Sequence, residues 1–319
     1  MVTPKVKAGI FYRDLKKGIS PSCKNKKPSV EGFASGMYML HIVTDSSAML
    51  QENTAALEHF HVAPLHIMYS NQSYLDGKEI NSDQILDVCR SGVIPTTSQP
   101  SIGEKMDLYD SILSDPKATI LDITIADGLS GTYQTACMAK ENCSDPSRVT
   151  VYNTQTLAGP HRHLVQLADT LRKEGKSIDE ILATLQVRSQ KDVSMVATSD
   201  CLYLSRSGRV SSFVGTAGAM MRLVPVVGTI QQGTKLSLLK ANRTMKKAIQ
   251  FMSENLAKNG VDSSYCIYVA HAGSPEMGAY AKETLQKRFP EAKITVEPLC
   301  ALFTIHGGPG AVSIQAIPA

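Results

Sequence analysis

The sequence has 319 residues, 43% of them hydrophobic, and a formal net charge of +4, enough for one large domain or two ordinary ones with a sizeable core. The basic excess lies in residues 1–36, which hold eight Lys or Arg and two Asp or Glu. The nearly neutral remainder argues against nucleic-acid binding. The apolar runs are too short to cross a bilayer, and seven scattered cysteines without a CxxC pair argue against a disulfide scaffold or a zinc site and for a reducing cytoplasm.

Residues 1–38 are rich in Pro, Ser and Lys, which predicts a flexible basic extension. The segment lacks the apolar stretch of a secretory signal. Two interpretations stay open. The favoured one starts translation at Met37 or Met39, directly before the first predicted strand, and the other makes the segment a basic tether to an acidic surface.

Along the rest of the chain, short β-rich runs alternate with helical patterns. Strands are expected at Met39–Thr44, Ala118–Ile125, Arg148–Tyr152, Ser194–Thr198, Tyr265–Ala270 and Lys293–Pro298. The second of these runs is apolar on both faces, as a strand covered by helices must be. The alternation predicts an α/β protein with largely parallel sheets. We expect two α/β domains, at residues 39–170 and 171–319, with a largely parallel sheet in the first.

The sequence between the predicted strands indicates where several helices begin and end. Ser101–Glu104 and Ser177–Glu180 have the pattern of a capping box, in which the serine hydroxyl and the glutamate each bond a backbone amide of the other. Gly159–Gly175 is expected to be a long helix that ends at its last glycine.

The stretch GLSGTYQTA, Gly128–Ala136, follows the apolar strand and precedes a helical pattern that begins near Ser130. Ligands of doubly wound sheets bind at such strand ends, where a helix start offers free amides and a partial positive charge. Ser130 adds a hydroxyl donor, and Gly131 lets a ligand approach the backbone. The combination suits a carboxylate or phosphate. Taken alone, the stretch favours the simpler interpretation that Ser130 is an N-cap.

Two further loops also carry groups that could hold an anion. Ile94–Ser101 carries three hydroxyl side chains ahead of Pro100, and in Thr304–Ile314 the side chain of His306 opens a loop that contains three glycines. The sequence has no Walker A motif, GxGxxG or HExxH, and it shows no evident pair of catalytic carboxylates. It therefore predicts a site that holds an anion but has no evident catalytic group.

Six stretches, in this order along the chain, resemble the DegV family of fatty-acid-binding proteins, the lipid-presenting subunits of bacterial fatty acid kinase. They are Ile42–Ala48, VAPLHIMY with YLDGKEI, SGVIPTTSQPS, LSGTYQTA, Leu202–Ser211 and IHGGPGAV. The matches run from about residue 39 to the end of the chain.

The resemblance implies two α/β domains that enclose an acyl chain. Thr97 and Ser130 hold the carboxylate, His306 supports their hydrogen bonds, and a separate kinase subunit phosphorylates the bound acid. Arg206 and Arg243 match positions thought to meet that kinase. The protein is then a cytoplasmic, bacterial subunit of phospholipid metabolism that needs no cofactor, metal or nucleic acid, has no catalytic residue and allows transient contact with a membrane surface.

The residue chemistry agrees with this implication. Two neutral hydroxyls and a helix N-terminus hold a carboxylate through charge-assisted hydrogen bonds, and they leave its oxygen more nucleophilic than an Arg or Lys clamp would. The rival hypothesis is a hydrolase of a lipid-like substrate with Ser130 as nucleophile and His306 as base, but it lacks an obvious third member. Another amphiphile, such as a bile acid or an isoprenoid acid, is a third alternative, and the sequence leaves acyl length and unsaturation open.

Overall fold

The structure is a computed structural model that describes residues 39–50, 58–210, 222–230, 233 and 235–319. The chain divides into two units, Met1–Met37 and Tyr38–Ala319, and everything below concerns the second. The predicted basic extension, and with it the choice between a late translation start and a tether, lies outside the described residues. Within the described part, no helix has the length and apolarity that a bilayer crossing requires.

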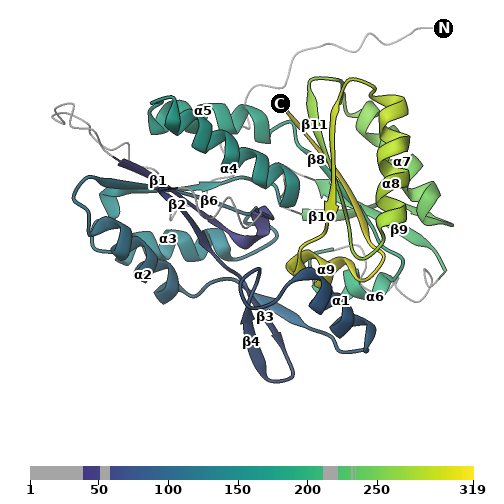
Figure 1. The fold of residues 1–319 in the computed structure, drawn as a ribbon, viewed down its shortest axis with the longest axis horizontal. Coiled ribbons are helices and arrows are strands. Elements are labelled where there is room, and N and C mark those ends of the chain that lie inside the picture. The colour runs from purple at the N-terminus through teal and green to yellow at the C-terminus, as the bar shows by residue number, and fades with distance from the viewer. Residues whose placement is uncertain (1–38, 51–57, 211–221, 231–232, 234) are drawn as a thin grey trace, which may run out of the picture. The chain divides into compact units, whose positions relative to one another are not determined.

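The first sheet is parallel throughout and is covered by helices on both faces (Figure 1). Its strand order is β2-β1-β6-β7, with β1 at Met39–Asp45, β2 at Phe60–Ala63, β6 at Ala118–Thr124 and β7 at Val149–Asn153. On one face lie α4 (Ala158–Lys173) and α5 (Ile178–Ser189), and on the other α2 (Ile102–Leu113) and α3 (Thr132–Asn142). This double cover explains why β6 is apolar on both faces.

The second sheet has six strands in the order β10-β9-β8-β13-β11-β12. They are β8 (Val193–Ala197), β9 (Val224–Ile230), β10 (Lys235–Asn242), β11 (Tyr265–His271), β12 (Lys293–Pro298) and β13 (Val312–Pro318). Only β11 and β12 pair in parallel. The expectation of largely parallel sheets is therefore correct for the first sheet and wrong for the second.

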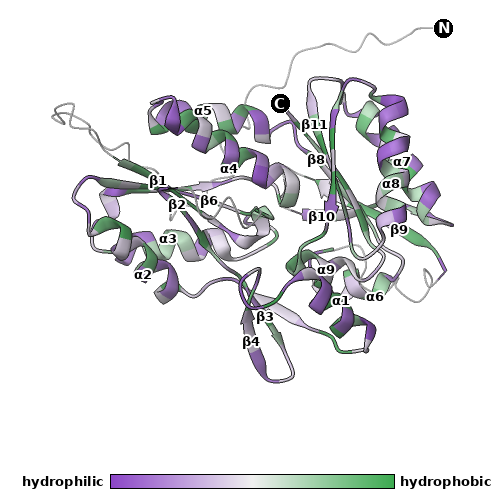
Figure 2. Cartoon of the chain, in the orientation of Figure 1, coloured by the Kyte–Doolittle hydropathy of each residue, from purple (hydrophilic) through white to green (hydrophobic). Residues whose placement is uncertain are grey.

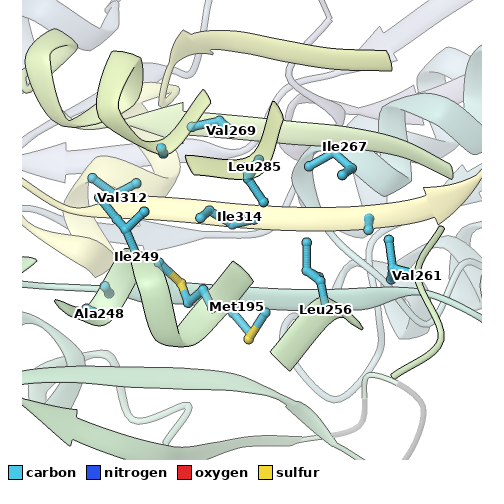
Figure 3. Close-up of a cluster of buried hydrophobic side chains, with 14 of the residues drawn as sticks. Met195, Ala248, Ile249, Leu256, Val261, Ile267, Val269, Leu285, Val312 and Ile314 are labelled. Atoms are coloured by element: carbon cyan, nitrogen blue, oxygen red, sulfur yellow. The ribbon is translucent and has the colours of Figure 1, made fainter. Parts of the chain in front are cut away.

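One face of the second sheet packs against α7 (Met245–Lys258) and α8 (Pro275–Arg288). Figure 3 shows this core, where Val312 and Ile314 of β13 meet Ile249 and Leu285 from the two helices. Hydrophilic and hydrophobic residues alternate along α7 and α8, as expected for helices with one face on a sheet and one in water (Figure 2). The opposite face of the sheet packs in part against α4 and α5 and in part lines the cavity described below.

A small antiparallel sheet, β4-β3-β5, completes the arrangement with several short elements. They are η2 (Ser46–Ala48), β3 (His66–Tyr69), β4 (Gln72–Leu75), α1 (Ser82–Arg90), β5 (Thr96–Ser98), η4 (Pro146–Arg148), α6 (Cys201–Ser207) and α9 (Ala301–Gly307). Helix α9 packs against both α1 and α6. This contact brings the C-terminal part of the chain next to the small sheet.

The predicted elements are confirmed to within one or two residues at their ends, including all six strands. Both capping boxes form: Glu104 N donates to Ser101 Oγ over 3.1 Å, and Glu180 N donates to Ser177 Oγ over 3.3 Å. Three strands of the second sheet were not predicted. In β9, Pro225 and Gly228 weaken the strand pattern, and β10 and β13 have no comparable apolar run.

The domain boundary at residues 170 and 171 stays a prediction, since residues 38–319 form one compact unit. The two large sheets do lie on either side of it. Helix α5, however, which this boundary assigns to the second domain, packs with α4 against the first sheet.

An ion pair lies inside the first layer of the fold. Lys105 of α2 and Asp122 of β6 are both fully buried, and Lys105 Nζ and Tyr109 OH both donate to Asp122 Oδ2. The second carboxylate oxygen has no hydrogen-bond partner among the described residues. Loss of either charge would leave the other uncompensated in a dry interior, which costs far more than loss of an exposed pair.

We therefore expect Lys105→Met to lower the free energy of unfolding by about 3–5 kcal/mol, measured by urea denaturation. The matched control is Lys287→Met, which removes an exposed lysine that pairs with Glu283 at 2.7 Å, and it should leave stability unchanged within error. Equal effects of the two substitutions would contradict the prediction.

Candidate functional site

Thr97 is held in place by β5, the strand that ends the small sheet. Its backbone pairs with Ile67 of β3. Its hydroxyl oxygen lies 3.1 Å from Nε2 of His306, although the two residues are 209 positions apart. The structure therefore brings two of the predicted site residues into direct contact.

Ser130 lies in the turn between β6 and α3. The turn is closed by backbone bonds from Leu129 and Ser130 to the carbonyl of Ala126. The helix begins at Thr132, slightly later than predicted, and its N-cap is Gly131 without a side-chain cap. Ser130 is thus not the N-cap residue. Its Oγ lies 2.8 Å from Thr132 Oγ1 and accepts a bond from the Thr132 amide over 3.3 Å.

Gly131 lies directly against the side chain of Gln99, and its role in ligand binding stays a prediction. A Cβ added at Gly131 would lie 2.9 Å from Nε2 of Gln99, nearer than real Cβ contacts allow. The absence of a side chain at Gly131 therefore leaves room for the Gln99 side chain, which comes from the loop that follows Thr97.

His306 lies in the last turn of α9 and does not open a loop, so that prediction is wrong. The glycine-rich turn begins two residues later, where Gly308 and Gly310 have φ of 78° and 81°, a backbone region that favours glycine. A Cβ at Gly308 would also lie 2.5 Å from the ring of Tyr203. Burial, together with the nearby charge of Arg209, lowers the pKa of His306 to about 4, so the imidazole is neutral at neutral pH.

Several of these side chains line a cavity whose empty volume is about 990 Å³ when the open solvent at its mouth is included. Thr97, Ser130, His306 and Arg209 lie among its lining residues. Much of the remaining wall is apolar, with Leu65, Ile125, Leu157, Leu299, Leu302 and Phe303. A ligand that fits this cavity has a long apolar body and a small polar group.

Arg209 is a site residue that the sequence analysis missed. Among the described residues that line the cavity it is the only cation, and its Nε donates to the Leu129 carbonyl over 3.3 Å. It also borders a shallow outer pocket together with Ser130, Gly131 and Lys235. The signal was present, because Arg209 belongs to the same SGR stretch as Arg206 and directly follows a glycine with φ of 67°.

The two arginines expected to meet a partner are both exposed. Arg206 lies on α6, the helix whose Leu204 and Ser207 line the cavity. Arg243 lies just beyond the end of β10. Leu204 of α6 and Ala241 of β10 belong to one hydrophobic cluster. Their role as a partner surface stays a prediction.

The geometry favours holding an anion over nucleophilic attack. Within the described part of the chain, no hydrogen bond joins Ser130 to His306, whose Nε2 is next to Thr97 instead. A histidine with a lowered pKa is also a weak base. Nor do the described residues contain a cluster of His, Cys, Asp or Glu that could hold a metal ion. The site can offer neutral donors and one cation to an oxyanion at the mouth of an apolar cavity.

Several known proteins of the same description match this chain over most of its length. A DegV domain-containing protein of Staphylococcus aureus is 29% identical over 277 residues, which cover 86% of this chain and 98% of the relative. Another, from Caldanaerobacter subterraneus, is 27% identical and covers 87% of this chain and 98% of the relative.

Solved structures agree in fold. A fatty-acid-binding DegV family protein from Streptococcus agalactiae superposes with a TM-score of 0.80 at 26% identity, covering 88% of this chain and 99% of the other. A DegV family protein from Thermus thermophilus, described by its fatty acid binding, gives 0.79 at 27% identity with the same coverage. A family model described as "Uncharacterised protein, DegV family" matches residues 39–319. This chain therefore belongs to the DegV family.

Proposed function

We propose that this protein binds a long-chain fatty acid and presents its carboxylate to a kinase subunit, which forms the acyl phosphate. The observation that carries the proposal is the cavity itself, apolar along much of its wall and lined at one end by Thr97, Ser130 and His306. The relatives from Streptococcus agalactiae and Thermus thermophilus, both described by fatty acid binding, support the same ligand class.

The head group is held by neutral donors in this proposal. His306 donates from Nε2 to Thr97 Oγ1, which frees the Thr97 hydroxyl to donate to the carboxylate. Thr132 donates to Ser130 Oγ in the same way, and Ser130 then donates to the ligand. The uncapped start of α3 adds amide groups and a favourable dipole. Arg209 contributes positive potential at the mouth without closing on the carboxylate.

The tail supplies most of the binding energy. Burial of hydrocarbon contributes about 0.8 kcal/mol per CH₂, so a chain of about 16 carbons gains on the order of 10 kcal/mol. A ligand held this strongly leaves slowly, which suits a protein that carries a lipid to a second site of reaction.

Catalysis belongs to the partner in this proposal. The bound carboxylate attacks a phosphoryl group that the kinase supplies, and this chain contributes binding and orientation only. Arg206 and Arg243 form the partner surface, and the protein works in the cytoplasm of a bacterium with transient access to a membrane surface for its lipid.

We expect Thr97→Val and Ser130→Ala each to weaken fatty acid binding by about ten- to a hundredfold, because each removes one hydrogen bond to a charged group. The double variant should lose less than the sum of the two free energies, since both hydroxyls act on one carboxylate. The measurement is a binding titration of the acid and of its methyl ester.

Wild type should bind the ester poorly, and the two variants should discriminate less between ester and acid. If wild type binds both alike, or if both single variants bind the acid normally, the carboxylate assignment fails. A serine-reactive fluorophosphonate probe provides the second control, and labelling of Ser130 would favour a hydrolase instead.

The neutral state of His306 has a measurable consequence for the ligand-free protein. Its pKa is lowered from 6.5 to about 4 in the fold, so the unfolded chain takes up the proton first and wild type loses stability as pH falls through this window. His306→Gln removes this titrating group, so the loss of stability between pH 6.5 and pH 4 should shrink by about 3 kcal/mol. Urea denaturation at a series of pH values measures it, and parallel curves for the two proteins would contradict it.

Charge reversal at Arg206 or Arg243 should reduce partner-dependent phosphorylation of the bound acid and leave fatty acid binding intact, because exposed rim charges act mainly on encounter. The readouts are acyl phosphate formation with the kinase subunit and a lipid titration without it. Lys282→Glu, which reverses an exposed charge on α8, serves as the control. Loss of bound lipid in both arginine variants would show that these residues belong to the pocket or the fold.

A further inference from the structure

The second sheet forms one wall of the cavity, and polar side chains lie along this wall. Thr229 of β9, Ser194 of β8, and Ser313 and Gln315 of β13 all line the cavity. Ser194 and Gln315 are direct cross-strand partners in the antiparallel pair β8–β13. We call these four residues the polar strip. A plain hydrocarbon tail gives such side chains nothing to bond.

The orientation of the strip follows from strand alternation. Val312, Ile314 and Ala316 of β13 point into the core beneath α7 and α8 (Figure 3). The residues between them, Ser313 and Gln315, therefore lie on the opposite face of the sheet, where the cavity is.

Three members of the polar strip have partners within the protein. The Gln315 amide nitrogen donates to Ser194 Oγ over 2.9 Å and to the Leu157 carbonyl over 3.1 Å, and its oxygen accepts from the Gly159 amide. Ser194 Oγ in turn donates to Asp192 over 2.9 Å. Thr229 Oγ1 donates to the Ser194 carbonyl over 3.4 Å. The hydroxyl and amide donors of Thr229, Ser194 and Gln315 therefore already have acceptors within the protein.

Ser313 is different. Its side chain is buried, with the residue 7% exposed, and its hydroxyl has no hydrogen-bond partner among the described residues. The cross-strand neighbours of Ser313 are Val196 and Ala270, whose side chains cannot pair with a hydroxyl. A buried hydroxyl without a partner is destabilising, and natural proteins seldom keep one unless something else satisfies it.

We propose that Ser313 bonds an oxygen on the acyl chain, and that the ligands of this protein include hydroxylated long-chain fatty acids. The inference rests on the proposed function, because the carboxylate at Thr97 and Ser130 fixes which chain position reaches Ser313. A water molecule is a weaker candidate, since a buried water needs two to four polar partners and the donors of Ser194 and Gln315 are committed. A chain hydroxyl has a single O–H donor, which one bond to Ser313 Oγ satisfies.

The test compares octadecanoic acid with monohydroxylated octadecanoic acids that carry the hydroxyl at successive chain positions. In displacement titrations, wild type should bind one isomer, or two adjacent isomers, about tenfold more tightly than the others. Ser313→Ala should erase this preference among isomers while keeping the affinity for octadecanoic acid.

Ser194→Ala is the matched control, because it removes a hydroxyl from the same wall that already has partners. This variant should keep the preference for the isomer but lower the melting temperature. Ser313→Ala should keep or raise the melting temperature of the ligand-free protein, since it removes an unsatisfied group.

The proposal is overturned if wild type binds all isomers alike, if Ser313→Ala keeps the preference, or if Ser194→Ala is the variant that abolishes it. In each of these cases the proposed function still stands if octadecanoic acid binds better than its methyl ester. If octadecanoic acid does not bind at all, both proposals fail together.

Discussion

The contact between Thr97 and His306 is the interaction on which the polar end of the cavity depends. It ties β5, at the edge of the small sheet, to the last turn of α9, 209 residues later. The packing of α9 against α1 and α6 holds the histidine in place. Without this link, Thr97 would lie on the edge strand of a three-stranded sheet, and no other described side chain bonds its hydroxyl.

The same end of the cavity is arranged so that its donors are neutral. Burial keeps His306 uncharged, Ser130 is paired with Thr132 rather than with a base, and Gly131 leaves room for the Gln99 side chain. Arg209 is the single cation among the described residues of the wall. An anion held mainly by hydroxyls keeps more electron density on its oxygen than one clamped between charges, which suits the attack on phosphorus that we propose.

The sequence predicted best those features of the fold that depend on a few neighbouring residues. The capping boxes at Ser101 and Ser177 and the two-sided apolar strand β6 follow from patterns of a few residues. The antiparallel second sheet did not follow, because β13 pairs with β8 and β11 across long connections and β9 has a weak strand pattern. The resemblance named Thr97, Ser130 and His306 and implied that His306 supports the two hydroxyls, but the Gly131–Gln99 and Ser130–Thr132 contacts depend on packing that no motif shows. Arg209 lies three residues from Arg206 in the same stretch, but its place in the cavity wall depends on tertiary packing and could not be read from the motif.

The central claim, that the cavity holds a fatty acid by its carboxylate, is tested most directly by mass spectrometry of the protein purified from a bacterial host. The account predicts that the native protein carries one acyl ligand per chain and that solvent extraction releases it as a free long-chain acid. Recovery of an empty protein that takes up no added fatty acid, or of a lipid without a carboxylate, would contradict the account.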